Sequence, residues 1–302
     1  MSIERKSNLM SSNDFISGSL AGIVQVLLGQ PLDMMKVRMQ TKPLEYKTLI
    51  QTGKKILHSE GPFGFYKGTL SPLCGISFCV AIQFSSNEAA KNFFMNRNYS
   101  DKSNKDPTKL SLLQYIYSGI FAGFCNSFVM SPVELFRIKM QVQSKDSAVQ
   151  YNGTVECAKK IFQNYGIRGV YQGLCSTILR ECPAYAIYFG IYETLMQRSL
   201  NKYNSKSEIP LLHITTYGAL AGVFLWVGTF PFDVIKSRIQ ADNIQDRKYK
   251  SILQTFNHIV KENGVGGLYK GLPPCLVRAP FTNAATFLTF EIASKHLNKN
   301  TK

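Results

Sequence analysis

Three charged side chains interrupt otherwise apolar stretches of this 302-residue chain, and they are the residues best suited to bind a ligand. Arg180 and Glu181 are adjacent, and Arg278 lies in a later stretch of similar length. A charge inside hydrocarbon costs at least about 2.5–3.5 kcal/mol, so by default it is a functional group that faces a polar interior. Glu181 can neutralise one arginine but not both, which leaves a positive charge for a ligand carboxylate. An internal Arg–Glu pair that only fixes helix packing is the alternative.

The stretches that hold these charges belong to a set of six, each long enough to be a membrane span. Four of the six contain no Asp, Glu, Lys or Arg, and the other two are interrupted near the middle by the charges above. Because a helix needs roughly 20 apolar residues to cross the hydrocarbon, we expect an all-α membrane protein with six transmembrane helices. The stretches are 15–32, 68–87, 110–133, about 174–198, 209–232 and about 272–296.

A large soluble helical protein is the alternative fold, and paired glycines argue against it. They recur at i and i+4 in every odd-numbered stretch, where small residues allow close helix packing in lipid. In a soluble helix each interior glycine would cost about 1 kcal/mol relative to alanine. The pairs are Gly18 and Gly22, Gly119 and Gly123, and Gly218 and Gly222.

Each odd-numbered stretch ends in the same signature, Pro-x-(Asp/Glu)-x-x-(Lys/Arg), so the chain is a threefold repeat. We expect repeats over 1–105, 106–205 and 206–302 that form one integrated domain. Short amphipathic segments between paired stretches predict helices that lie at the membrane surface, near 49–58, 155–162 and 252–260. The signatures are Pro31-Leu-Asp33-Met-Met-Lys36, Pro132-Val-Glu134-Leu-Phe-Arg137 and Pro231-Phe-Asp233-Val-Ile-Lys236.

The composition excludes several classes of protein. The net charge is +16, but the basic residues flank apolar stretches and form no nucleic-acid motif, so anionic lipid is the expected partner. The seven cysteines and four histidines form no metal-ligand, disulfide or catalytic arrangement, so we expect no metal, no cofactor and no enzyme. The polar segment 1–13 lacks a cleavable presequence, and polar joins near 97–109 and 201–209 predict loops.

The triplicated signature, the paired glycines and the elements Glu60-Gly61 and Tyr66-Lys67-Gly68 closely resemble the mitochondrial carrier family. The resemblance covers roughly residues 12–298. It implies a six-helix bundle with pseudo-threefold symmetry in the mitochondrial inner membrane, with termini facing the intermembrane space. One central site would be reached alternately from either side, and we expect a monomer.

The resemblance also implies two gates. On the matrix side a ring of ion pairs should join Asp33 to Arg137, Glu134 to Lys236 and Asp233 to Lys36, and solvated charges at helix ends are the alternative. On the cytoplasmic side only one bridge is expected, Lys91 to Glu193, so the resting state should be open to the cytoplasm. The expected glutamine braces of the matrix ring are Gln40, Gln141 and Gln240. The other cytoplasmic gate residues are Glu88, Tyr192, Phe290 and Glu291.

Lipid should bind where the even-numbered helices begin, because helix N-termini attract phosphate. We expect up to three cardiolipin sites, the weakest in the second repeat, where Gln172 replaces a lysine. The residues expected at these sites are Lys67, Gly68, Gly173, Lys270 and Gly271.

Within the family, Arg180-Glu181-Cys182-Pro183 and Arg278-Ala279-Pro280 look like the carnitine/acylcarnitine, ornithine and related amino-acid carriers. The implied substrate is a small zwitterion, with its carboxylate on Arg180 and Arg278 and its amino or quaternary nitrogen on Glu181. The span-two contact should involve Cys79, Val80 and Gln83. No acid precedes Glu88 there, which disfavours a basic amino acid of the ornithine or arginine type. That substrate, a non-aminated organic acid and a non-transporting receptor remain the alternatives.

Overall fold

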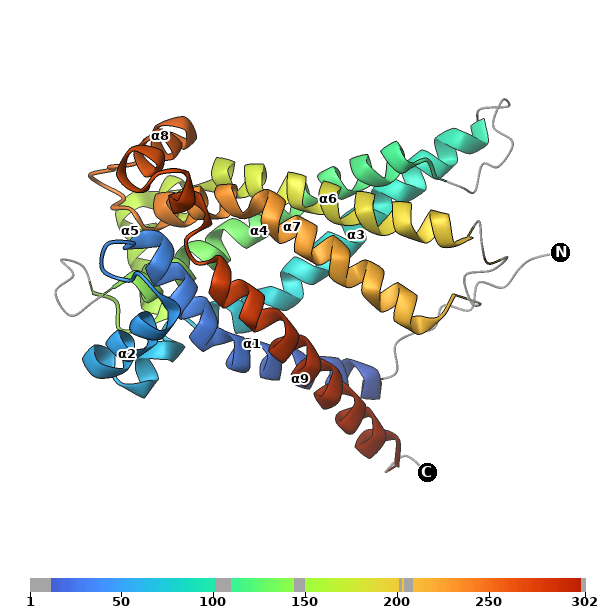
Figure 1. Ribbon diagram of the computed structural model, residues 1–302, viewed down its shortest axis with the longest axis horizontal. Coiled ribbons are helices and arrows are strands. Elements are labelled where there is room, and N and C mark those ends of the chain that lie inside the picture. The colour runs from blue at the N-terminus through green and yellow to red at the C-terminus, as the bar shows by residue number, and fades with distance from the viewer. Residues whose placement is uncertain (1–11, 101–109, 144–149, 201–202, 204–208, 300–302) are drawn as a thin grey trace.

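The computed structural model describes residues 12–100, 110–143, 150–200, 203 and 209–299, and within them the chain is helical with no strand. The expected N-terminal segment and most of the two expected joins lie outside these residues. Six long helices correspond to the six expected stretches, which confirms the all-α prediction (Figure 1). They are α1 (Ser12–Thr41), α3 (Leu70–Ser100), α4 (Leu112–Val142), α6 (Leu174–Leu200), α7 (Leu211–Ala241) and α9 (Leu272–Lys299).

Every long helix is long enough to cross a bilayer. The shortest, α6, has 27 residues, which is about 40 Å at 1.5 Å per residue, against about 30 Å of hydrocarbon. The segments Pro62–Tyr99, Leu112–Val142 and His213–Ala241 also meet this requirement by composition. Helices α1, α4 and α7 continue past their uncharged stretches because the proline of each signature lies inside the helix rather than ending it.

Three short amphipathic helices lie across one end of the molecule, as the sequence predicts. They are α2 (Leu49–Glu60), α5 (Thr154–Val170) and α8 (Ile252–Asn263). Thr48 and Ser251 cap two of them by accepting a hydrogen bond from a backbone N–H three residues on. The chain then turns through Gly61 and Gly264, whose φ values of 74° and 66° favour glycine. Short 3₁₀ turns, η1 (Pro62–Tyr66) and η3 (Val265–Tyr269), lead into α3 and α9.

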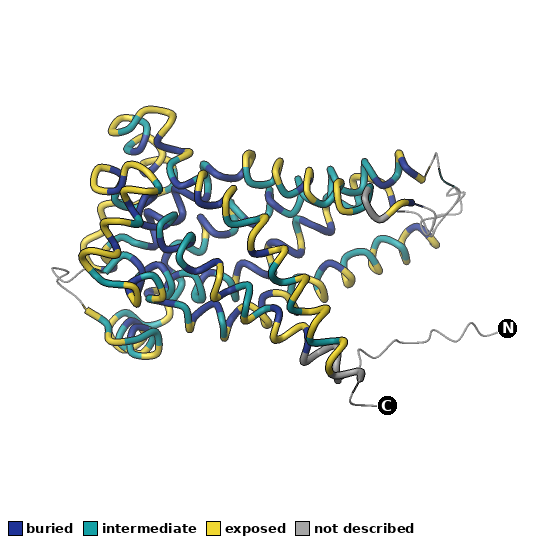
Figure 2. Tube along the Cα trace, turned by 60° about the horizontal axis from the view of Figure 1, so that its bottom comes forward, coloured by how far each residue is buried: buried dark blue, intermediate teal, exposed yellow. Residues whose placement is uncertain are grey.

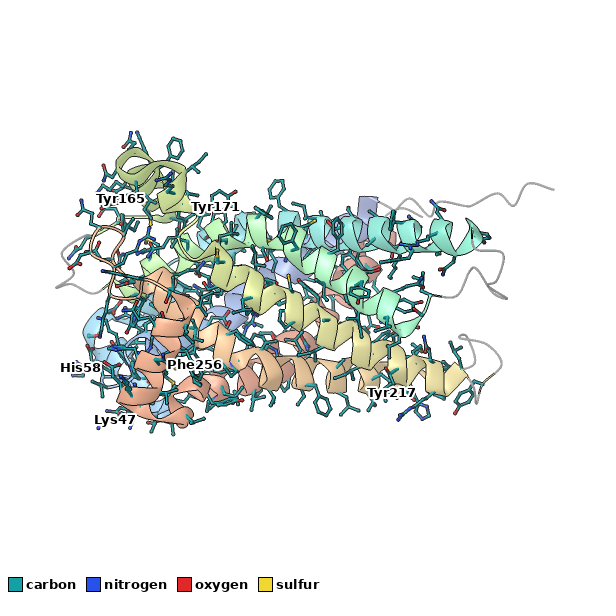
Figure 3. The ribbon with its side chains drawn as sticks, turned by 90° about the horizontal axis from the view of Figure 1, so that it is seen from above. Lys47, His58, Tyr165, Tyr171, Tyr217 and Phe256 are labelled. Carbon is teal, nitrogen blue, oxygen red and sulfur yellow. The ribbon has the colours of Figure 1, made fainter. Side chains whose placement is uncertain are left out.

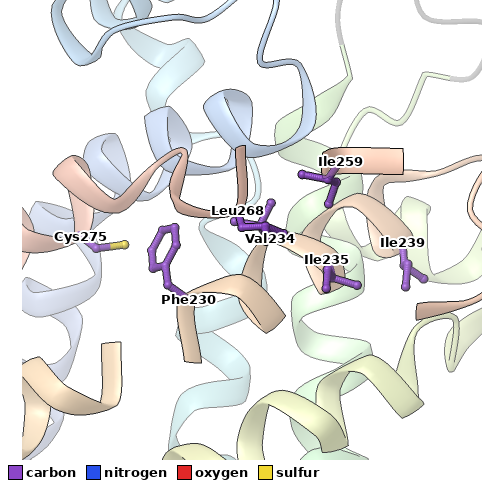
Figure 4. Packing of buried hydrophobic residues seen from close by; sticks show 7 residues of the cluster. All are labelled: Phe230, Val234, Ile235, Ile239, Ile259, Leu268 and Cys275. Atoms are coloured by element: carbon purple, nitrogen blue, oxygen red, sulfur yellow. The ribbon is translucent and has the colours of Figure 1, made fainter. Parts of the chain in front are cut away.

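The long helices converge toward the short helices and diverge toward the end where α1 begins and α9 ends (Figure 1). Figure 3 shows Lys47 and His58 at the convergent end and Tyr217 toward the opposite end. Helix α1 packs on α9, α3 on α4, and α6 on both α4 and α7. Buried residues are densest at the convergent end (Figure 2), where one apolar cluster joins α7, α8, η3 and α9 (Figure 4). Its members are Phe230, Val234, Ile235, Ile239, Ile259, Leu268 and Cys275.

The paired glycines lie in a close helix contact only in the second repeat. A Cβ added to Gly119 would lie 3.0 Å from the carbonyl oxygen of Tyr185, and one added to Gly123 would lie 3.0 Å from that of Glu181. The prediction of close packing is therefore wrong for the other two repeats. Among the paired glycines, those with no neighbour closer than 4.0 Å are Gly18, Gly22, Gly218 and Gly222.

Candidate functional site

A ring of three ion pairs joins α1, α4 and α7 where these helices converge. Each acid pairs with a base of another of these three helices, and the partners are those that the family resemblance implies. The pairs are buried or half-buried, so each charge depends on its partner for stabilisation. A cavity of about 50 Å³ lies among the six side chains. The pairs are Arg137 with Asp33 at 2.6 Å, Lys36 with Asp233 at 2.8 Å, and Lys236 with Glu134.

Among the described residues, only one of the three expected glutamine braces forms a hydrogen bond with a residue of this ring. Gln40 donates from Nε2 to Asp233 Oδ2 at 2.9 Å. Gln240 instead donates to the carbonyl oxygen of Ser131 at 3.3 Å, because its side chain is turned toward α4 and packs against Gly173. The amide of Gln141 is buried and has no hydrogen-bond partner among the described residues. The brace prediction is therefore wrong for Gln141 and Gln240.

Gln30 is a ring residue that the sequence did not reveal. Its Oε1 accepts a hydrogen bond from Arg137 Nη2 at 2.7 Å, and its Nε2 donates to the carbonyl oxygen of Lys67 at 3.0 Å. Gln30 is fully buried and so ties the base of one ring pair to the start of α3. Ser131 and Phe230 occupy its place in the other repeats, so no repeat pattern marks it.

The three mid-span charges lie beside the ring rather than apart from it. Arg180 pairs with Glu181, whose side chain is 2% exposed, and Arg180 Nε also lies 3.6 Å from Asp233 Oδ1. Arg278 Nε lies 3.2 Å from Asp33 Oδ1. The Nε atoms of both arginines nevertheless make no aligned hydrogen bond. The residues that we expected to bind a ligand therefore share two acids with the ring.

Trp226, the sole tryptophan of the chain, was also missed by the sequence argument. The Nζ atom of Lys36 lies 4.8 Å from the centre of its ring system, and the Cζ atom of Arg180 lies 5.6 Å from it. Both distances are within the range of cation–π attraction. The single occurrence of tryptophan in a span was the only available signal. Trp226 therefore contacts one ring cation and one ligand-site cation.

The expected span-two residues approach the same region from α3. Tyr185 on α6 donates its hydroxyl hydrogen to Gln83 Oε1 at 2.8 Å, and Asn126 donates to the Tyr185 oxygen at 3.3 Å. Cys79 is buried, whereas Val80 is exposed. Tyr185 thus links α3, α4 and α6 one helical turn beyond Glu181, and the sequence analysis had not selected it.

The opposite end of the bundle does not form the expected bridge. Lys91 Nζ lies 3.2 Å from Glu88 Oε1 on its own helix rather than pairing with Glu193. Glu291 likewise pairs within its helix, with Lys295 at 2.8 Å. The Lys91–Glu193 bridge is therefore not formed in this structure, in which the helices diverge at this end, and for a state closed at this end it stays a prediction. Tyr192 stacks on Tyr188, and Phe290 is exposed.

The glycines expected at lipid sites have positive φ values and pack against α4, α7 and α1. A Cβ added to Gly68 would lie 3.0 Å from the carbonyl oxygen of Arg137. The neighbouring lysine is already paired, since Lys67 Nζ lies 2.6 Å from Glu60 Oε2. In the third repeat Lys270 donates to Asn263 Oδ1 at 3.1 Å, and burial lowers the pKa of this lysine. The φ values of Gly68, Gly173 and Gly271 are 78°, 86° and 88°.

Comparison with known proteins finds similarity along the whole chain. The family model described as mitochondrial carrier protein matches residues 7–98, 108–203 and 207–301. The mitochondrial glycine transporter YMC1 of Saccharomyces cerevisiae is 42% identical over 94% of this chain and 91% of its own. The glutamate/glycine mitochondrial carrier ymc1 of Schizosaccharomyces pombe is 39% identical over 95% of both chains. The mitochondrial carnitine/acylcarnitine carrier protein of Mus musculus is 34% identical over 94% of both chains.

Proposed function

Because the chain belongs to the mitochondrial carrier family, whose members move small solutes across the inner membrane, we propose that its substrate is a small zwitterionic amino acid. The observation that carries this proposal is the group Arg180, Glu181 and Arg278, two cations and one carboxylate beside the ion-pair ring. The names of the relatives support it. Glycine, glutamate and carnitine each combine a carboxylate with a cationic nitrogen.

Recognition follows from the chemistry of the three side chains. An arginine binds a carboxylate through two parallel N–H groups, and Glu181 accepts hydrogen bonds from an ammonium group. Glycine can occupy one arginine and Glu181, whereas glutamate can occupy both arginines and Glu181. The ring and the ligand group together hold five cations and four carboxylates, so an amino acid with one net negative charge leaves this region neutral. The cations are Lys36, Arg137, Arg180, Lys236 and Arg278, and the acids are Asp33, Glu134, Glu181 and Asp233.

The ion-pair ring is the proposed matrix gate. Its closure, together with the divergence of the helices at the other end, supports a carrier state that is open toward the cytoplasm. Substrate would enter from the divergent end, bind beside the ring and leave on the matrix side after the ring opens. We also propose cardiolipin as the lipid partner and a monomer as the transporting unit, in keeping with the strongly basic chain.

A carnitine-like substrate is the second candidate, and the aromatic face of α6 favours it. Tyr185 stacks on Phe189 and Tyr188 stacks on Tyr192, so aromatic rings line the helix that carries Glu181. Such rings attract quaternary nitrogen. A basic amino acid is disfavoured because Gln83 is neutral and accepts a hydrogen bond from Tyr185.

Counter-exchange in liposomes tests the proposal. Purified protein is preloaded in turn with glycine, glutamate, carnitine, ornithine and 2-oxoglutarate, and uptake of each labelled compound is measured. We expect uptake of glycine or glutamate, loss of uptake in Arg278→Ala, and about a ten- to hundredfold loss of amino-acid uptake in Glu181→Gln. Uptake of 2-oxoglutarate alone, with Glu181→Gln unaffected and shown by thermal shift to be folded, would contradict the proposal.

A further inference from the structure

The carboxylate proposed to hold the substrate nitrogen is almost completely closed to solvent. The Glu181 side chain is 2% exposed, although it belongs to the candidate ligand group. Arg180 pairs with it, and α4 passes close to its backbone, since a Cβ added to Gly123 would lie 3.0 Å from the Glu181 carbonyl oxygen. A ligand can therefore reach Glu181 only through the room that the neighbouring side chains leave.

Tyr185 is the next side chain on this face of α6. It follows Glu181 by four residues, so the two side chains lie on the same face, about one turn apart. Because α6 runs from the convergent to the divergent end, Tyr185 is the nearer of the two to the divergent end. Gly123 lies against both, since its added Cβ would also lie 2.9 Å from Tyr185 Cδ2. A substrate that enters from the divergent end thus meets Tyr185 before Glu181.

Four contacts hold the Tyr185 ring in place. Its hydroxyl donates to Gln83 Oε1 on α3 at 2.8 Å and accepts from Asn126 Nδ2 on α4 at 3.3 Å. The ring stacks on Phe189, with the centroids 6.2 Å apart, and its edge packs against Gly123. A tyrosine whose ring and hydroxyl are both fixed has little freedom to swing aside, so it bounds a space of fixed size.

The paired glycines of the second repeat make room for these two rings. A Cβ added to Gly119 would lie 2.9 Å from Phe189 Cδ2, just as one added to Gly123 would lie 2.9 Å from Tyr185 Cδ2. The tyrosine itself occurs in this repeat alone. The residues at its position in the other repeats, counted from the glycines that precede α3 and α9, are Val80 and Asn283. The close packing of α4 on α6 and the fixed tyrosine therefore occur together.

We propose that Tyr185 is the specificity-determining residue for the substrate nitrogen, because it admits a primary ammonium group to Glu181 and excludes a quaternary one. This inference rests on the proposed function. An ammonium group has hydrogen-bond donors and approaches a carboxylate oxygen closely. Three methyl groups on the nitrogen remove these donors and need more room. Forcing extra methyl groups into a packed site is unfavourable, and here it would break the contacts that fix the ring.

The proposal separates the two candidate substrates. A ring that limits the room accepts glycine or glutamate and rejects the trimethylammonium group of carnitine. A ring that attracts quaternary nitrogen would have the opposite effect. Glycine and its N-methylated derivatives distinguish the two, because each has one carboxylate and one cationic nitrogen and they differ only in the number of methyl groups.

Counter-exchange in liposomes measures the half-saturating concentrations of glycine, N-methylglycine, N,N-dimethylglycine and N,N,N-trimethylglycine. Wild type should require at least about tenfold more trimethylglycine than glycine. Tyr185→Ala removes the ring and should reduce this ratio by about tenfold, by lowering the value for trimethylglycine. Tyr185→Phe keeps the ring but loses both hydrogen bonds and should reduce the ratio less. The matched control is Tyr117→Phe, at a tyrosine of α4 that is 56% exposed, and it should keep the wild-type ratio.

The outcomes separate this inference from the proposed function. Thermal shift checks the folding of each variant, and if Tyr185→Ala does not fold, Tyr185→Phe decides. Glycine uptake with the wild-type ratio in both Tyr185 variants would overturn the inference alone, as would weaker binding of trimethylglycine once the ring is removed. If wild type takes up glutamate but not glycine, the N-methylated glutamates replace the series. Uptake of neither amino acid would contradict the proposed function, and the role of Tyr185 with it.

Discussion

Exchanging the charges of the Glu134–Lys236 pair should restore transport far better than exchanging those of the Asp233–Lys36 pair. The single variants Glu134→Lys and Lys236→Glu each leave a like-charge pair in the ring. The Lys236 side chain is 1% exposed, and breaking a buried pair costs about 3–5 kcal/mol. The fraction of carriers with a closed ring should therefore fall by a factor of at least about a hundred. The double exchange recreates one pair, and among the described residues neither Arg180 nor Arg278 forms an ion pair with Glu134.

The Asp233–Lys36 exchange meets an additional cation. Asp233→Lys would place an ammonium group near Arg180, whose Nε now lies 3.6 Å from Asp233 Oδ1. Two like charges about 4 Å apart repel by about 4 kcal/mol at an effective dielectric constant of 20. The exchange also removes the carboxylate that accepts a hydrogen bond from Gln40. The repulsion therefore offsets most of the free energy that the new pair regains.

Counter-exchange of glycine in liposomes measures the difference, with the apparent melting temperature as a check on folding. We expect the Glu134/Lys236 exchange to transport within about tenfold of wild type and the Asp233/Lys36 exchange to remain at least about a hundredfold slower. If both exchanges restore transport equally, Arg180 has no energetic contact with Asp233. The charge balance derived from the structure would then be wrong.

Three further outcomes are expected. Burial raises the pKa of the Cys157 thiol to about 12, so this thiol should react slowly with maleimide in detergent at pH 8. Peptide mass spectrometry should find the label on exposed Cys175 long before it appears on Cys157. Early labelling of Cys157 would contradict its burial. Gly123→Leu should lower the apparent melting temperature by several degrees, because an α6 carbonyl lies 3.0 Å from the added Cβ, whereas Gly22→Leu should not. Native mass spectrometry should show cardiolipin retained in preference to neutral lipid, with the weakest site beside Gln172, and equal retention would argue against these sites.

The repeat made the ring predictable. An acid and a base recur at the same two positions of three equivalent helices, and the resemblance to the carrier family implies which neighbouring helix supplies the partner of each acid. Gln30 and Trp226 occur in only one repeat and therefore carry no such signal. The contacts of Arg180 and Arg278 with ring acids were also hidden. These contacts depend on the depth of α6 and α9, which carry the arginines, relative to α1 and α7, which carry the aspartates. The spacing of residues along the chain does not determine that relative depth.

The absence of the Lys91–Glu193 bridge has a physical cause. The bridge requires the bundle to be narrow at the end where α1 begins. The helices diverge there, so residues in equivalent sequence positions stand at different distances at the two ends. Lys91 then finds its nearest acid, Glu88, on its own helix. A repeat pattern fixes which residues are equivalent, but not which end is closed.

The ring and the ligand site share residues for an electrostatic reason. A cation as buried as Arg180, whose side chain is 12% exposed, needs an anion even when no ligand is present. The ligand site contains two arginines and a single acid, Glu181, so the second counter-ion must come from a neighbour. The nearest acids are Asp33 and Asp233 of the ring. The candidate carboxylate site thus takes its counter-ions from the ion-pair ring.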